Sequence, residues 1–162
     1  MYPGAGTLPR MGHGGGNRIH HSAIVVTDLD RSLPFWRDGV GLDVLMDSAF
    51  EGDWPTLFGV PRPSLRSVFL GDLRQPDSGL VELVSFEGLD PDPAIATAGP
   101  PGAGFLLLSL YVDLDQVLAR LAPLGVEPEA VIEVDGLKGP VRMATVRDPA
   151  GVLVELIDLP PN

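Results

Sequence analysis

Cysteine is missing from the sequence, and lysine nearly so. The chain has no cysteine, and Lys138 is the single lysine among its 11 basic residues. The lack of cysteine excludes disulfide bonds, thiolate nucleophiles and thiolate metal sites. The scarcity of lysine leaves a Schiff-base mechanism with almost no candidate residue.

Long apolar stretches are also missing. No window approaches the roughly 20 apolar residues that a membrane helix needs. The start, MYPGAGTLPR, has neither an apolar segment nor an early basic cluster of the kind that a secretory signal carries. We therefore expect a cytoplasmic protein without a membrane partner. The formal net charge of −11 argues against nucleic acid, because a phosphate backbone favours clustered lysine and arginine.

Aromatic residues are few, and the apolar residues are mostly aliphatic. Aromatics make up 6% of the chain and hydrophobic residues 44%, so we expect an aliphatic core. A chain of 162 residues can form one domain, or two small modules that share a core. Residues 1–17 are rich in glycine and proline and are predicted to be a disordered tail. Residues 89–104 have a similar composition and are predicted to link two modules, 18–88 and 105–159.

An internal repeat organises the chain. The stretch RIHHSAIVVTDLDRSLPFW (Arg18–Trp36) is an apolar strand, an acidic turn and the start of a helix. A weaker copy, LSLYVDLDQVLARLAPLG (Leu108–Gly125), has the same order. Each copy is followed by a matching strand, GLVELVSF (Gly79–Phe86) and GVLVELID (Gly151–Asp158). Two copies indicate a pseudo-symmetric pair, because a solenoid would need more repeats.

Each module is predicted to contain four strands and one helix. In the first module we expect strands over residues 19–26, 42–46, 65–70 and 79–86, with a long loop over 48–63. Its first strand is apolar on both faces and should be covered on both sides. Its helix should begin near Asp30 or Ser32, because Pro34 fits the first helical turn. In the second module we expect strands over 105–112, 126–134, 141–147 and 152–157, and a helix over 113–123.

Two glutamates lie where aliphatic residues would be expected. Glu82 and Glu155 occupy matching positions in VELV and VELI, and a buried carboxylate without a partner costs several kcal/mol. His21 lies on the face of the first strand that can meet Glu82. One imidazole and two carboxylates suit Mn²⁺, Fe²⁺, Co²⁺, Ni²⁺ or Zn²⁺. Two alternatives remain open. The glutamates can pair with arginine, the candidates being Arg66, Arg142 and Arg147. A register slip of one residue would exchange His21 with its outward neighbour, His20.

The chain resembles the vicinal oxygen chelate superfamily, which includes glyoxalase I, methylmalonyl-CoA epimerase, extradiol dioxygenases, and fosfomycin- and bleomycin-resistance proteins. The resemblance is carried by IHHSAIVVTDLDRSLPFWRDGVGLDV, VELVSF, YVDLDQVLARLAPLGV and VRDPAGVLVELI, in that order. It implies an α+β fold of two βαβββ modules that form a pseudo-symmetric curved sheet around a central cleft. It also implies a homodimer.

The resemblance assigns metal ligands to the first and fourth strands of each module. Carried over residue by residue, these ligands are His21, Glu82 and Glu155, which we expect to meet at one point. The fourth family position is a histidine, and here that position is Leu107 or Leu106. A site with three protein ligands and open positions is still workable for catalysis.

Three functions follow from these expectations. The first is a metal-dependent lyase, isomerase or epimerase that acts on a small carbonyl or thioester compound through an enediolate-type intermediate, with Glu82 or Glu155 moving the proton. The second is a metal-free protein that binds a drug or metabolite, favoured by the apolar run at residues 106–108. A ring-cleaving dioxygenase fits less well, because its second histidine is missing. Trp54 and Phe58 either line the mouth of the cleft or anchor their own loop.

Overall fold

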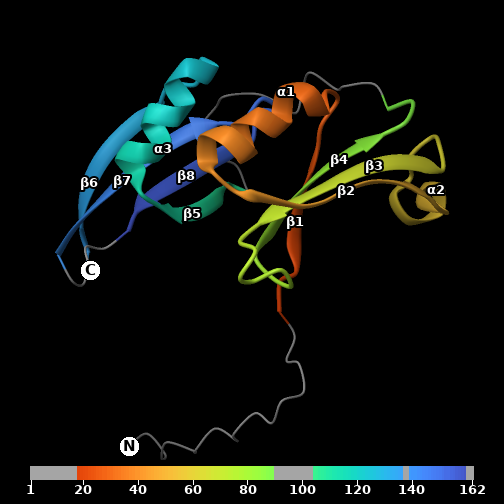
Figure 1. Cartoon of the computed structure of the whole chain (residues 1–162), viewed down its shortest axis with the longest axis horizontal. Helices are drawn as coiled ribbons and strands as arrows, with labels where there is room; N and C mark the ends of the chain where they lie inside the picture. Colours follow the sequence, from red (N-terminus) through yellow and green to blue (C-terminus); the bar gives the residue numbers. More distant parts are fainter. Residues whose placement is uncertain (1–17, 90–103, 137–138, 160–162) are drawn as a thin grey trace, which may run out of the picture.

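The computed structural model describes residues 18–89, 104–136 and 139–159. The first module contains β1 (His21–Val25), α1 (Leu29–Pro34), a π-helical turn η1 (Phe35–Val40), β2 (Asp43–Glu51), α2 (Trp54–Phe58), β3 (Ser64–Gly71) and β4 (Leu80–Phe86). Its sheet has the order β1-β4-β3-β2, in which β1 and β4 are parallel and the other pairs are antiparallel (Figure 1).

The second module repeats this arrangement. It contains β5 (Leu108–Val112), α3 (Leu114–Leu121), a 3-10 turn η2 (Ala122–Leu124), β6 (Ala130–Gly136), β7 (Gly139–Arg147) and β8 (Leu153–Asp158). The strand order is β5-β8-β7-β6, again with a parallel first pair. The predicted α+β fold of two βαβββ modules is therefore confirmed. No helix among the described residues is long and apolar enough to cross a membrane.

Several element boundaries differ from the predictions. α1 begins at Leu29, one residue before the expected Asp30, because the Asp28 carboxylate accepts a hydrogen bond from the Arg31 amide and caps the helix there. Pro34 ends α1, and the chain continues as the π-helical turn, in keeping with the backbone hydrogen bond that proline removes. The strands expected from residues 105 and 126 begin later, at Leu108 and Ala130.

The loop predicted over residues 48–63 is wrong. β2 continues to Glu51, and the short helix α2 follows. Asp53 caps α2 by accepting a hydrogen bond from the Thr56 amide, and Gly59 ends it with a left-handed φ of 71°. The predicted tail, 1–17, and most of the predicted linker, 89–104, lie outside the described residues.

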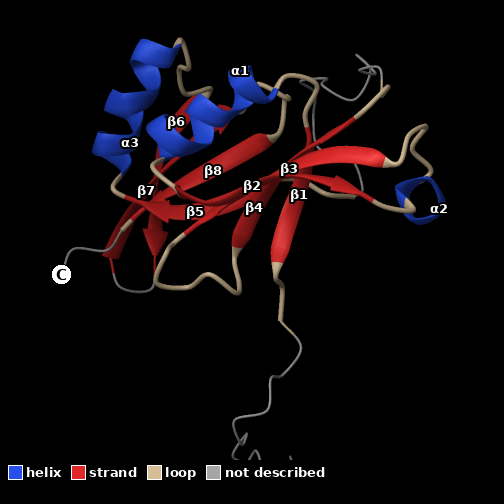
Figure 2. Ribbon diagram, turned by 45° about the vertical axis from the view of Figure 1, so that its right-hand side comes forward, coloured by secondary structure: helices blue, strands red, loops and turns tan. Residues whose placement is uncertain are grey.

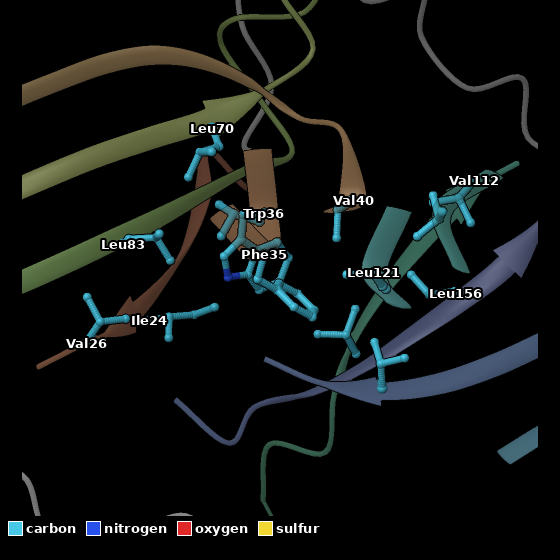
Figure 3. Packing of buried hydrophobic residues seen from close by; sticks show 14 of the residues in the cluster. Ile24, Val26, Phe35, Trp36, Val40, Leu70, Leu83, Val112, Leu121 and Leu156 are labelled. Atoms are coloured by element: carbon cyan, nitrogen blue, oxygen red, sulfur yellow. The ribbon is translucent and has the colours of Figure 1, made fainter. Parts of the chain in front are cut away.

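One hydrophobic core joins the two modules. Phe35 and Trp36 lie between strands of both modules, in contact with a cluster that reaches Leu121 and Leu156 (Figure 3). On β1 the core side is formed by Ile24, which is buried. The expectation that both faces of β1 are covered is not met in this chain, because Val25 on the opposite face is 48% exposed. Each sheet thus has a core face and an open face.

Helix α3 fixes the second module against the first. Leu114, Val117 and Leu121 form its buried stripe, at the spacing of an amphipathic helix. Figures 1 and 2 show α1 and α3 next to each other on the same side of the molecule, and α3 contacts η1 directly. Arg120 of α3 donates hydrogen bonds to the carbonyl oxygens of Gly39 (2.9 Å) and Val40 (3.1 Å) at the end of η1.

A buried carboxylate also connects the modules. Trp36 Nε1 donates to Asp148 Oδ2 at 3.2 Å, and the other carboxylate oxygen accepts from the amides of Ala150 and Val152. Burial raises the pKa of Asp148, and these hydrogen bonds oppose that shift only in part. Asp148 therefore serves as the acceptor that holds both the turn before β8 and the indole of the first module.

Candidate functional site

A pocket of about 680 Å³ lies against the open face of the first sheet. Strand alternation brings His21 of β1, Ser67 of β3 and Glu82 of β4 to this face. Ile24, Val68 and Leu83, on the other face of the same strands, belong to the core. Helix α2 lies at the end of this sheet that is farthest from the second module (Figure 1). The lining residues are His21, Ala23, Val25, Phe50, Trp54, Phe58, Gly59, Val60, Leu65, Ser67, Phe69, Glu82, Val84, Phe86 and Leu89.

His21 and Glu82 meet in this pocket, as the sequence predicts. His21 Nε2 lies 3.2 Å from Glu82 Oε2, and the side chains are 35% and 14% exposed. Ser67 Oγ donates a hydrogen bond to the other oxygen, Glu82 Oε1, at 2.5 Å. Phe69 packs edge-on against the imidazole with ring centroids 5.1 Å apart. The carboxylate is thus held on one side by a hydroxyl and faces an imidazole on the other.

His20 is exposed, as expected for an outward strand end, but its ring turns back onto His21. The two Nδ1 atoms lie 2.7 Å apart, and the rings make an edge contact at 5.0 Å. A neutral imidazole carries one N–H, so one of the two rings must donate at this contact. When His21 directs its own N–H from Nε2 to Glu82, the donor is His20. This second contact orients the His21 ring, a role that strand alternation alone did not predict.

Glu155 has the same place in the second module as Glu82 has in the first. In β8 it pairs with Ser109 of β5, just as Glu82 in β4 pairs with Ala23 of β1. Ser109 Oγ donates to Glu155 Oε2 at 2.7 Å. The predicted equivalence of the two acids therefore extends to their strand register.

The three predicted metal ligands do not lie together in one chain. His21, Glu82 and Glu155 all lie on open sheet faces, which point away from the core that joins the modules. Within residues 18–89, 104–136 and 139–159, no group of three His, Cys, Asp or Glu side chains is placed to hold a metal ion. The expectation that a single chain gathers His21, Glu82 and Glu155 at one point is thus corrected. His21 and Glu82 form a pair, and Glu155 lies apart from it.

The register identifies the position that corresponds to His21. His21 precedes Ala23 by two residues, and Leu107 precedes Ser109 by two. Leu107 is therefore the counterpart of His21 in the second module. Leu106, the other candidate, is 54% exposed and falls on the alternate side.

The arginines proposed as partners of the glutamates pair with other residues. Arg66 forms two hydrogen bonds with Asp47, and Arg147 bonds Glu129 at 2.7 Å. Arg142 bonds Asp115 and lies 3.5 Å from Asp158. These contacts lower the pKa of Asp47 and of Asp115, with the hydrogen bond from arginine as the main cause. The arginine alternative for Glu82 and Glu155 is not supported.

Helix α2 contributes aromatic side chains to the pocket. Trp54 and Phe58 are stacked at 5.9 Å with an interplanar angle of 13°, and Phe58 contacts Phe86 of β4 at 5.8 Å. The two residues therefore line the pocket and also anchor their own segment. Sequence reasoning missed Ser67 and Phe69. Their signal was the alternation in LRSVFL, which puts Leu65, Ser67 and Phe69 on one face.

Comparison with known proteins points to one superfamily. The model of the Glyoxalase/Bleomycin resistance protein/Dioxygenase superfamily matches residues 18–156. The "Lactoylglutathione lyase-like protein terB" of Aspergillus terreus is 34% identical over 149 residues, which cover 88% of this chain and 75% of that protein. The protein YwkD of Bacillus subtilis is 30% identical over 141 residues, which cover 86% of this chain and 95% of YwkD.

Solved structures share the fold. A glyoxalase family protein from Bacillus cereus superposes with a TM-score of 0.73 at 23% identity, covering 91% of this chain and 97% of that one. The trypanothione-dependent glyoxalase I of Leishmania major has a TM-score of 0.60 at 26% identity, covering 88% of this chain and 87% of that one.

Proposed function

Because the chain belongs to the Glyoxalase/Bleomycin resistance protein/Dioxygenase superfamily, we propose that it is a metal-dependent lyase, isomerase or epimerase acting on a small carbonyl compound. The observation that carries this proposal is the His21–Glu82 pair at 3.2 Å on the wall of a large pocket. A histidine and a carboxylate in such a pocket are a typical acid–base and ligand set.

The residues of the pocket fit a divalent metal. An imidazole nitrogen and a carboxylate oxygen suit Mn²⁺, Fe²⁺, Co²⁺, Ni²⁺ and Zn²⁺. Glu82 is mostly buried and has a hydroxyl and an imidazole as neighbours instead of an arginine, so a cation would compensate its charge. His21 and Glu82 supply two ligands, and Glu155 is the proposed third.

Glu155 is proposed to come from a second copy of the chain. The open face of the second sheet carries exposed apolar side chains, with Tyr111 71% and Ile132 55% exposed. The open face of the first sheet likewise exposes Val25. A homodimer that opposes these faces would bury apolar surface and bring Glu155 to the His21–Glu82 pair.

The protein's own residues hold and move the proton. Ser67 fixes one oxygen of Glu82, so the other oxygen remains directed to the pocket and to His21. Glu82 or Glu155 removes the proton from the carbon beside the substrate carbonyl. In an isomerisation the same glutamate returns it at the neighbouring carbon, and in an epimerisation the other glutamate delivers a proton on the opposite face. The apolar lining disfavours water beside the reacting carbon. When bound, the metal supplies a Lewis acid for the negative charge that develops on the substrate oxygens.

A metal-free binding protein is the second candidate. It is favoured by Leu107, an apolar residue in the place that corresponds to His21, and by the mostly apolar lining of the pocket. A ligand that binds tightly and is recovered unchanged would support this function over the enzyme.

Metal analysis separates the two candidates. We expect elemental analysis to find a divalent metal, and a metal at about 100 times its Kd to add about 2.7 kcal/mol to the free energy of unfolding in a thermal-shift screen. His21→Ala and Glu155→Gln should each abolish this increase. Glu127→Gln is the matched control, because Glu127 is exposed and outside the site. Full turnover by chelated, metal-free protein would overturn the proposal.

A further inference from the structure

The aromatic residues of this chain gather around one cavity. The sequence has 10 aromatic residues (Phe 6, Trp 2, Tyr 2). Half of them line the pocket: Phe50, Trp54, Phe58, Phe69 and Phe86. Aromatic faces and edges of this kind favour stacking and edge contacts with another flat ring. We propose that the pocket binds an uncharged aromatic carbonyl compound, and this inference rests on the proposed function because it names the substrate class of the same site.

The pocket has a polar end, where Phe69 packs beside His21, and an end formed mainly by aromatic side chains. Glu82, Val84 and Phe86 follow one another on the open face of β4, and α2 lies beside Phe86 through the Phe58 contact. A strand rises about 3.3 Å per residue, so Glu82 and Phe86 are about 13 Å apart along β4. This span suits a fused two-ring system or a substituted single ring, with its oxygen atoms toward His21 and Glu82.

A buried donor lies on the aromatic side. Trp54 Nε1 is inaccessible to solvent and has no hydrogen-bond partner, the one such side-chain nitrogen or oxygen found among the described residues. The indole edge that carries this atom packs against Gly52, so Trp54 offers the pocket its ring and not its N–H.

The charges oppose an anionic thioester. Glutathione carries two carboxylates. Among the described residues, those that line the pocket include Glu82 but no lysine or arginine. On the open face around Glu155, Arg147 is bound to Glu129 and to the Gly151 carbonyl oxygen. A net charge of −11 adds general repulsion toward anions. The site is therefore better suited to a neutral ring than to the glutathione conjugate in the name of its fungal relative.

Binding to chelated, metal-free protein tests this without any catalysis. The first probe is 1-hydroxy-2-acetonaphthone, which is neutral and has a hydroxyl beside its carbonyl group. The second is 1-hydroxy-2-naphthoate, which has a carboxylate in place of the acetyl group, and the third is S-lactoylglutathione. Calorimetry should give the neutral ketone a Kd at least about tenfold lower than either anion, equivalent to ~1.4 kcal/mol. Tighter binding of either anion would overturn the proposal.

Two neighbours in α2 provide the matched variants. Phe58 lines the pocket, whereas Leu57 beside it does not and is 65% exposed. Phe58→Ala should raise the Kd of the naphthyl ketone about tenfold, since an aromatic contact contributes up to about that factor. Leu57→Ala should change it less than twofold. Equal changes in Kd for the two variants would contradict the proposal. If a variant does not fold, the order of the three probes' Kd values for the wild-type protein decides.

The outcomes separate this inference from the proposed reaction. If the ketone binds but neither metal nor turnover is found, the substrate class stands and the enzymatic proposal fails. If the protein binds metal and converts an aliphatic carbonyl compound but does not bind the ketone, the enzymatic proposal stands and the inference on substrate class fails.

Discussion

The two modules share one architecture but differ on their open faces. Their strand orders and registers correspond, and Glu82 and Glu155 occupy the same place. The first module has His21 at the position that Leu107 occupies in the second. Helix α2 lies between β2 and β3 of the first module, whereas in the second module β6 and β7 pair up to their ends, at Gly136 and Gly139. The two modules therefore share the fold through residues of their core faces, while their open faces carry different residues. The open face was therefore free to become a pocket in one module and an acid-bearing apolar surface in the other.

The largest expected effect comes from making the first module resemble the second. His21→Leu places in β1 the residue type found at the corresponding position before β5. Metal affinity and turnover should fall by at least about 100-fold, because a ligand and its contact with Glu82 are both lost. Titration calorimetry with Mn²⁺ or Zn²⁺ measures this, with Glu127→Gln as control. Unchanged affinity would mean that His21 is not a ligand.

The two tryptophans give the next comparison, on stability. Trp36→Phe removes the N–H that bonds Asp148 across the modules, so the free energy of unfolding should fall by about 1–3 kcal/mol. Trp54→Phe removes an N–H without a partner and should cost clearly less. Urea denaturation of both variants decides the matter. Equal losses would show that the connection between Trp36 and Asp148 adds nothing to stability.

The reverse exchange should have a smaller effect. Leu107→His gives the second module the imidazole that it lacks at the position corresponding to His21. If two sheets contribute to one site, metal affinity should increase about tenfold, or ~1.4 kcal/mol. Leu106→His, one residue away on the alternate side, is the control and should leave affinity unchanged. An increase in metal affinity with Leu106→His but not with Leu107→His would show that the correspondence of Leu107 to His21 is wrong.

The smallest expected effect is on how the free energy of unfolding depends on pH, and it comes from Asp148 in the second module. Its pKa is raised in the folded state by burial, so the folded state binds the proton more tightly than the unfolded state does. The contribution of Asp148 to stability should therefore rise as the pH falls through the interval between its folded and unfolded pKa values. The free energies of unfolding of wild type and of Asp148→Asn, measured at several pH values, give the contribution of Asp148 by their difference. A difference that shrinks as the pH falls would contradict it.

Sequence reasoning predicted what depends on periodicity. The repeat of strand, acidic turn and helix established two βαβββ modules, and alternation placed His21 on the same sheet face as Glu82. The same alternation, together with the matched VELV and VELI stretches, placed Glu82 and Glu155 in corresponding registers. These predictions needed only local chain geometry.

What the sequence did not reveal depends on how the modules pack. Trp36 contacts Asp148, 112 residues later, and no local pattern announces that pair. This packing directs both open faces away from the shared core, so Glu155 does not reach His21 within one chain. The helix α2 was missed because five residues are too few to show helical periodicity, although Asp53 and Gly59 are ordinary capping residues.

Subunit mixing tests most directly whether one metal site takes His21 and Glu82 from one chain and Glu155 from another. His21→Ala and Glu155→Gln would each be inactive alone, but a dimer containing one copy of each would retain one intact site. Unfolded and refolded together in equal amounts, the two variants should recover about a quarter of the wild-type metal sites and turnover, because half of the dimers are mixed. No recovery from a sample that forms mixed dimers would contradict the account.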